Sequence, residues 1–236
     1  MYCCDIVKTI LENPNTASWV GSLATLGAVI VALFLQEIRS IWDRPKLNLS
    51  INLAPPDCHK TILRGQDSRG QVVEIPTYYL RFWVMNDGSQ MANQAQVFLS
   101  GLSTHSPDGS FQRVESFLPM NLVWAHSRTV YADIAPSMGR HCDFGHVDNP
   151  NHGASPADVM FGKPKPFLSL DLEFLPNTNS HIVPSGVYRV ELKVAANNAN
   201  PTIKRFEFNI PDTWFNEEPK MFTEGIKIKE VNDLIS

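Results

Sequence analysis

Residues 19–35 read WVGSLATLGAVIVALFL, and this run determines how the rest of the chain is organised. It begins at Trp19, ends at Leu35 and contains no charged side chain. Helix geometry would place Trp19 and Trp42 about 35 Å apart, slightly more than the ~30 Å hydrocarbon core of a bilayer. Tryptophan rings prefer the two membrane interfaces. The run therefore predicts a membrane-spanning helix.

The predicted helix covers residues 17–44 and follows a short N-terminal segment, residues 1–16. Pro45 ends it, because proline disfavours helix in the residue before it. A cleaved signal peptide would need a basic start and a small-residue cleavage site, which LFLQEIRS does not offer. A buried core helix is the second alternative, since 17 apolar residues are few for a span. A helix lying on the membrane surface would need a polar face, which this run lacks.

The charges that flank the run predict its orientation. Lys8 is the only basic residue upstream, whereas Arg39, Arg44 and Lys46 lie downstream. An excess of lysine and arginine marks the cytoplasmic side. We therefore expect a single-pass protein of the plasma or inner membrane, with its N-terminus outside and residues 45–236 in the cytoplasm.

Small side chains recur along the predicted helix. Ala24, Ala28 and Ala32 follow one another at four-residue spacing, with Gly21 nearby. Such a row lets two helix backbones approach closely in lipid. It favours a homo-oligomer formed through the helix, although alanine and glycine are also common in single spans.

The pattern changes from helical to alternating after Pro45. Apolar residues occupy every second position in residues 47–53, 168–174, 188–194 and 206–210, with polar residues such as Asp171 between them. Strands with one apolar and one solvent-facing side are typical of antiparallel sheets. The chain therefore predicts a mainly β domain, an antiparallel β-sandwich of about eight or nine strands, with a short C-terminal helix and tail.

One stretch carries a resemblance to a known fold. Residues 84–97, VMNDGSQMANQAQV, contain Asn86 and Gly88 followed by the small residues Ala92 and Ala95. This resembles the pattern of bacterial Ig-like domains, in which a strand ends in Asn-x-Gly and the next begins after a small residue. The resemblance implies an Ig-like fold, and the turn at Asn86, Asp87 and Gly88 separately predicts a hairpin whose return strand covers residues 95–102. The resemblance implies no activity.

Composition excludes some classes of partner. A net charge of −4 gives no basic face for nucleic acid. The four cysteines are too scattered for a disulfide scaffold, which favours a reducing compartment. Whether Cys58 and Cys142 pair stays open.

The densest polar cluster is RHCDFGHVDNPNH, residues 140–152. Cys142 and His146, joined by Cys58 and His59 from another loop, could supply four zinc ligands. The usual paired ligand spacing is absent, so a structured loop is favoured, and we expect neither a metal nor another cofactor. Motifs that pair a nucleophile with a base are also missing, so an enzyme is not expected.

These observations predict a membrane-anchored, non-enzymatic interaction or sensor module. Its β domain would be presented in the cytosol to a protein partner, and its helix to the lipid bilayer. A self-associating effector that acts on the bilayer through its helix is the first alternative. A loop-borne metal-binding or enzymatic domain is the second.

Overall fold

A computed structural model describes residues 14–66, 70–151 and 165–231. It divides into two compact units, residues 1–44 and 45–236, each of which is considered by itself. The expectations for residues 1–13 and His152 lie outside the described residues, as do the side chains of Arg39 and Trp42.

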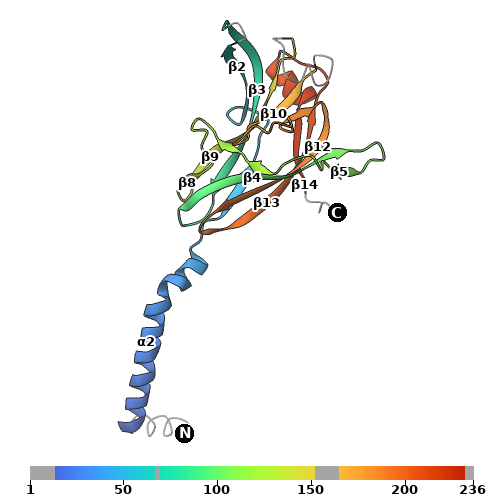
Figure 1. Cartoon of the computed structure of the whole chain (residues 1–236). Coiled ribbons are helices and arrows are strands. Elements are labelled where there is room, and N and C mark those ends of the chain that lie inside the picture. Colours follow the sequence, from blue (N-terminus) through green and yellow to red (C-terminus); the bar gives the residue numbers. More distant parts are fainter. Residues whose placement is uncertain (1–13, 67–69, 152–164, 232–236) are drawn as a thin grey trace. The chain divides into compact units, whose positions relative to one another are not determined.

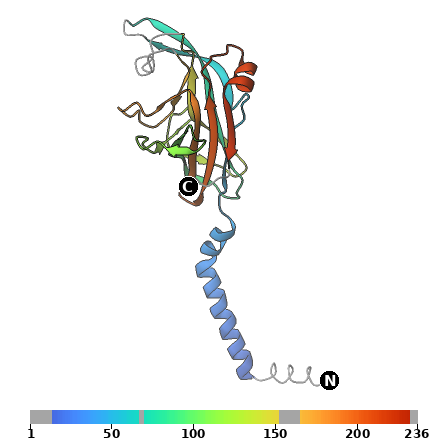
Figure 2. The ribbon, with the colours of Figure 1, turned by 90° about the vertical axis from the view of Figure 1, so that its right-hand side faces the viewer.

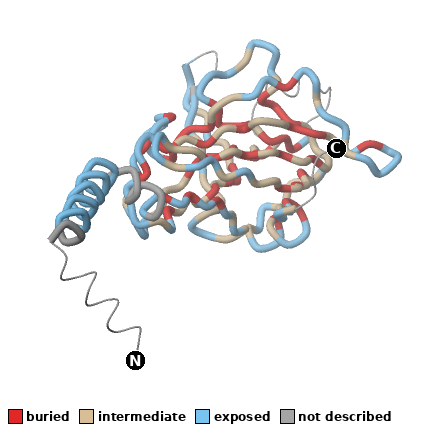
Figure 3. The backbone as a smooth tube through the Cα atoms, turned by 90° about the horizontal axis from the view of Figure 1, so that it is seen from below, coloured by how far each residue is buried: buried red, intermediate tan, exposed pale blue. Residues whose placement is uncertain are grey.

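The first unit contains one helix, α2 (Pro14–Trp42). Its window Ser18–Leu35 has a mean hydropathy of 2.0 and is entirely exposed (Figure 3). By length and composition this helix can cross a membrane, and a signal sequence near the N-terminus would meet the same criteria. The helix begins at Pro14 and ends at Trp42 rather than spanning residues 17–44, because proline fits the first turn of a helix.

The second unit is mainly antiparallel β and forms two sheets (Figure 1). The first sheet has the order β1-β3-β9-β10-β11, with β2 beside β3 and β7 beside β9. Its strands are β1 (Leu47–Ser50), β2 (Cys58–Gln66), β3 (Val72–Asn86), β7 (Val123–Trp124), β9 (Gly139–Asp148), β10 (Phe167–Leu170) and β11 (Ile182–Pro184).

The second sheet has the order β14-β13-β12-β4-β5, with β6 and β8 also paired to β4. A short helical segment, α4 (Glu218–Lys220) and η1 (Met221–Gly225), connects β13 to β14. The strands of this sheet are β4 (Ala92–His105), β5 (Phe111–Arg113), β6 (Met120–Asn121), β8 (Ala132–Ile134), β12 (Gly186–Ala196), β13 (Ala199–Ile210) and β14 (Lys227–Val231).

The core lies between the two sheets. The ring of Phe82 on β3 is 4.7 Å from that of Phe206 on β13, and Phe144 on β9 is 5.7 Å from Phe208. All four side chains are buried. Figure 2 shows the domain from the side, with the β2–β3 hairpin projecting beyond the neighbouring strands.

The alternating pattern is confirmed where strands are long. Tyr188, Val190 and Leu192 on β12 are buried, as are Phe206, Phe208 and Ile210 on β13. The expected strand count was wrong, because the described residues contain fourteen strands rather than eight or nine. Several of the additional strands have only two or three residues, too few to show a period.

Two further expectations need correction. The turn at Asn86 does not make a hairpin, because β3 belongs to the first sheet and β4 to the second. The strand expected over residues 168–174 ends at Leu170. Beyond it Phe174 is exposed and Asp171, expected to face solvent, is buried.

Candidate functional site

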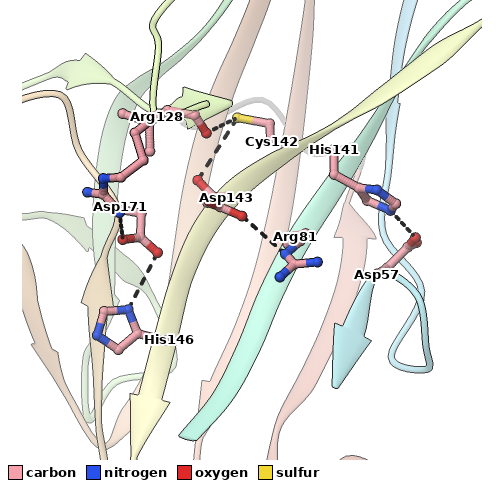
Figure 4. Close-up of polar contacts among 9 residues, drawn as sticks. Asp57, Arg81, Arg128, His141, Cys142, Asp143, His146 and Asp171 are labelled. Carbon is pink, nitrogen blue, oxygen red and sulfur yellow. Dashed lines mark hydrogen bonds and ion pairs between the residues drawn. The ribbon is translucent and has the colours of Figure 1, made fainter. Parts of the chain in front are cut away.

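The outer face of the first sheet carries a cluster of charged and aromatic side chains. Along β3, Tyr78, Leu80 and Phe82 are buried toward the second sheet, so the intervening residues face outward. The cluster, named here the outer polar cluster, is drawn in part in Figure 4. Its members are Asp57, Tyr79, Arg81, Arg128, His141, Asp143, His146, Asp148 and Asp171.

Arg81 and Asp143 form the ion pair at the centre of this cluster. They are cross-strand neighbours on β3 and β9, and Arg81 Nε lies 3.1 Å from Asp143 Oδ1. The side chains are only 15% and 9% exposed. Among the described residues neither atom has an aligned hydrogen bond, so charge holds the pair together. Burial and the nearby Asp171 raise the pKa of Asp143, while Arg81 opposes that shift.

His146 lies between two carboxylates. Its Nδ1 is 3.4 Å from Asp171 Oδ2, and its Nε2 is 3.8 Å from Asp148 Oδ2. Burial alone would lower the pKa of His146, but the hydrogen bond to Asp171 and the charges of Asp148 and Asp171 outweigh it. The pKa is therefore raised, which favours the imidazolium form. Arg128 Nη1, 3.6 Å from Asp171 Oδ1, adds a second positive charge.

Two more histidines border the cluster. His141 Nε2 lies 2.9 Å from Asp57 Oδ1, and the His141 ring meets the Trp83 ring edge-on at 4.6 Å. His59 on β2 stacks with Tyr79 at 6.3 Å. Burial and Arg81 lower the pKa of His59, whereas burial and then Asp171 raise that of Tyr79 to about 12. The neutral forms of both rings therefore dominate near pH 7.

An exposed loop, residues 126–129, follows β7 beside this cluster. Trp124 anchors it, because the indole Nε1–H donates to the carbonyls of Ala95 and Val130. The backbone then reverses through bonds from Arg128 N to Trp124 O and from Trp124 N to Thr129 O. His126 and Arg128 adopt left-handed φ values of 67° and 51°. For residues other than glycine this conformation costs free energy, and such strain is concentrated at functional positions.

The strained loop presents polar groups to solvent. The side chains of His126 and Arg128 are exposed, and Ser127 Oγ accepts a hydrogen bond from Arg140 Nη2 at 3.0 Å. Sequence reasoning missed Arg81, Arg128 and Asp171 as members of a site. Their roles depend on tertiary pairing, which no local pattern reveals.

The charged side chains of the outer polar cluster mostly face one another. Its two arginines and His146, whose pKa is raised, lie among four aspartates, so most of its charges are paired within the cluster. Both ring nitrogens of His146 face carboxylates, which leaves neither directed at a serine, threonine or cysteine. Nucleophilic catalysis needs such a pairing.

The four residues considered as zinc ligands are not brought together. Cys58 pairs in register with Leu80 and Cys142 with Phe82, so both thiols face the core, where they are buried and free. His59 and His146 pair with Tyr79 and face outward. Within residues 14–66, 70–151 and 165–231, no group of three or more histidine, cysteine or acidic side chains could hold a metal.

A β-bulge separates the most suggestive pair. Cys142 and His146 are four residues apart and would share a face of a regular strand. The register shifts so that Leu80 pairs with Gly145 but Arg81 pairs with Asp143, which leaves Phe144 as an extra residue. The inserted residue turns His146 to the outer face. Burial also raises the pKa of Cys58 to about 12, which keeps that thiol protonated.

The helix residues predicted to face lipid are exposed wherever their side chains are described. Trp19 is 71% exposed and Leu35 40%, and the small residues Gly21, Ala24, Ala28 and Ala32 are exposed too. Arg44 and Lys46, the downstream charges whose side chains are described, also lie at the surface. These placements suit a lipid-facing helix with basic flanks.

Comparison with known proteins adds no relative on which to base an assignment. No protein-family model matches the chain, and no characterised protein is significantly similar to it.

Proposed function

We propose that this protein is a single-pass, membrane-anchored interaction module that presents its β domain to a protein partner in the cytosol. One observation carries the proposal: an entirely exposed apolar helix, Ser18–Leu35, precedes a β domain with its own core. A soluble protein would leave about five turns of apolar side chains in water, at a cost of ~25 cal/mol per Å². A bilayer removes that cost.

The orientation rests on the downstream basic residues and on the cysteines. Arg44 and Lys46 are exposed at the end of the helix, and basic flanks favour the cytoplasmic side. Cys58 and Cys142 are free thiols, which suits a reducing compartment. The Ig-like relationship belongs to the same proposal, supported by a strand that ends at Asn86 and a next strand that begins at Ala92.

The loop of residues 126–129 is the proposed recognition surface. It is exposed, strained at two positions and fixed by buried Trp124, as expected of a binding loop on a rigid scaffold. His126 and Arg128 offer hydrogen-bond donors suited to acidic or polar groups of a partner. The outer polar cluster would hold the loop in place through the ion pair between Arg128 and Asp171, and it would take no part in catalysis.

Site-specific photocrosslinking in native membranes tests this role. A crosslinking residue at His126 or Arg128 should give a discrete adduct with another protein, whereas one at Arg64, 76% exposed on the projecting hairpin, should not. The adduct should disappear when Arg128→Ala is combined with the crosslinker at position 126. Equal labelling from all three positions would contradict a specific recognition loop.

The second candidate is a self-associating membrane effector, favoured by the small-residue face of α2. The hydroxyls of Ser22 and Thr25 bond to the carbonyls of Ser18 and Gly21, at 2.9 Å and 2.8 Å, so both hydroxyls are satisfied within the helix. A Cβ added at Gly21 would meet nothing within 4 Å. Chemical crosslinking in membranes should show a dimer that Ala28→Leu abolishes and Leu26→Ala retains. A monomer in both cases would exclude this candidate.

A further inference from the structure

Buried Asn86 fixes the point at which the chain enters the β domain. Its Oδ1 accepts the backbone N–H groups of Lys46 at 3.2 Å and Gly88 at 3.0 Å. Its Nδ2 donates to the carbonyls of Gln90 at 2.7 Å and Ile134 at 3.0 Å. The amide thus uses all four of its hydrogen-bonding positions. Segments around residues 46, 88–90 and 134 are held at one place.

Two exposed methionines flank this point. Met91 follows Gln90 directly and is 45% exposed, and Met138, whose carbonyl accepts the Asn86 N–H at 2.9 Å, is 61% exposed. Ser137 adopts a left-handed φ of 56°, and its N–H donates to Asn86 O. The Met91 and Met138 side chains therefore lie on segments that are both hydrogen-bonded to Asn86. We name this surface the linker-end surface.

Amide side chains fix the loops beside the linker-end surface. Asn198 Oδ1 accepts the Asn93 N–H at 3.0 Å, and Asn198 Nδ2 donates to the Met91 carbonyl at 2.8 Å. Asn197 Nδ2 donates to Gln94 Oε1 at 3.0 Å. These bonds connect the β12–β13 turn to the start of β4. The surface is consequently preorganised.

We propose that the linker-end surface, with Met91 and Met138 at its centre, rests in the headgroup layer of the bilayer. The inference depends on the proposed function, because the helix must span the membrane for this contact to form. Four peptide units separate Trp42, where α2 ends, from Lys46, a reach of at most ~14 Å. The headgroup layer is itself ~5–8 Å thick on each side.

The chemistry of the surface suits lipid more than water. Methionine is apolar and unbranched, so it adapts to an uneven interface. Exposed Lys46 beside it can pair with anionic lipid phosphates, which attract basic residues next to a membrane. Exposed Asp87 and Asp133, the latter an acceptor of the Gln94 N–H at 2.8 Å, keep their negative charges, so the attraction to the membrane rests on the two methionines and Lys46.

Fluorescence quenching in liposomes tests the contact on the full-length protein. Met91→Cys and Met138→Cys are labelled with the fluorophore NBD after Cys3 and Cys4 are replaced by serine, since Cys58 and Cys142 are buried. Ile62→Cys is the matched control: it is an exposed apolar position, 54% exposed, on the β2–β3 hairpin. It pairs with Pro76, ten residues and about 33 Å along β3 from Asn86.

The liposomes contain phosphatidylcholine and phosphatidylglycerol, with or without a lipid that carries a nitroxide on its headgroup. Emission at positions 91 and 138 should fall about twofold with the nitroxide lipid, as for an interfacial probe, and that at position 62 should not change. Melting curves of the labelled variants establish that each is folded.

Flotation of the same liposomes separates two kinds of failure. Protein that floats but shows no quenching at positions 91 and 138 overturns the inference and leaves the anchor intact. Protein that does not float overturns the proposed function itself. Equal quenching at all three positions would mean general adsorption and contradict a defined surface, and a blue-shifted but unquenched signal would mean that protein rather than lipid covers it.

Discussion

At the level of single residues, the buried Asn86 side chain connects several backbone segments. Asn86→Ala removes four hydrogen bonds, one in a buried and three in partly buried settings, and leaves the backbone groups at their other ends without this partner. Each such group costs about 1–3 kcal/mol, partly relieved by relaxation and water, so we expect a loss of roughly 2–4 kcal/mol. Thermal melts of the full-length protein in mild detergent measure it. Asn200→Ala, which removes an exposed amide, should change the melting temperature little, and equal effects of the two substitutions would contradict this role.

The Arg81–Asp143 pair should behave as a coupled unit. Arg81→Leu leaves Asp143 with a buried, uncompensated charge, so we expect a loss of about 3 kcal/mol, reduced to the extent that Asp143 takes up a proton. Replacing both residues by leucine should recover most of that loss, because neither charge remains. A double-mutant cycle by chemical denaturation measures the coupling. Additive effects would show that the two side chains do not interact.

His146 makes the stability of the fold depend on pH. Its pKa is raised in the folded state above its ordinary value of 6.5, so folded protein binds this proton more tightly. The stabilisation is fully present below pH 6.5 and is lost as the pH rises through the folded-state pKa. Compared with His146→Gln, the wild type should lose its advantage in melting temperature on going from pH 5.5 to pH 8.5. An advantage that grows with pH would reverse the sign and refute the assignment.

At the level of elements, the pairing of β3 with β9 depends on close packing over Gly139. A Cβ at this position would lie 2.3 Å from the Trp83 ring, so Gly139→Ala must displace the indole or the strand. We expect a loss of roughly 1–3 kcal/mol, as for other overpacked sites. Gly101→Ala on β4 is the control, because its Cβ would approach Glu191 only to 4.0 Å. Urea denaturation should separate the two variants, and equal stability would contradict the close packing.

The same strands show how far the sequence could be read. Alternation is visible in β12 and β13 because every second side chain is buried against the opposite sheet. The sequence could not show the bulge at Phe144, which depends on pairing with β3 and reverses the direction of His146. It also could not show that Asp171 is buried, because the cause is contact with His146 and Arg128 from distant segments. The alternation of apolar residues shows which side chains of one strand are buried. It does not show which residues of other strands they contact.

At the level of the whole molecule, the chain consists of two compact units. The first supplies an exposed apolar helix and the second a β domain with its own core and a strained, exposed loop. The uncharged run at residues 19–35 predicted the first unit, because lack of charge is a local property. The conformation of the exposed loop, residues 126–129, was not predicted, since its left-handed residues depend on bonds to Trp124.

The central claim is that the helix anchors the protein with its β domain in the cytosol. The native thiols are poor reporters, because Cys58 and Cys142 are buried and would resist labelling on either side. Arg64→Cys, at a position whose native side chain is 76% exposed, is a better one when Cys3 and Cys4 are serine. The measurement is labelling of this variant in spheroplasts by a membrane-impermeant maleimide, followed by alkaline extraction of the membranes.

We expect labelling only after permeabilisation, and full-length protein that stays in the membrane pellet. Labelling of intact spheroplasts would place the β domain outside, and a shortened, extractable protein would show that the helix is a cleaved signal sequence; either result would contradict the claim.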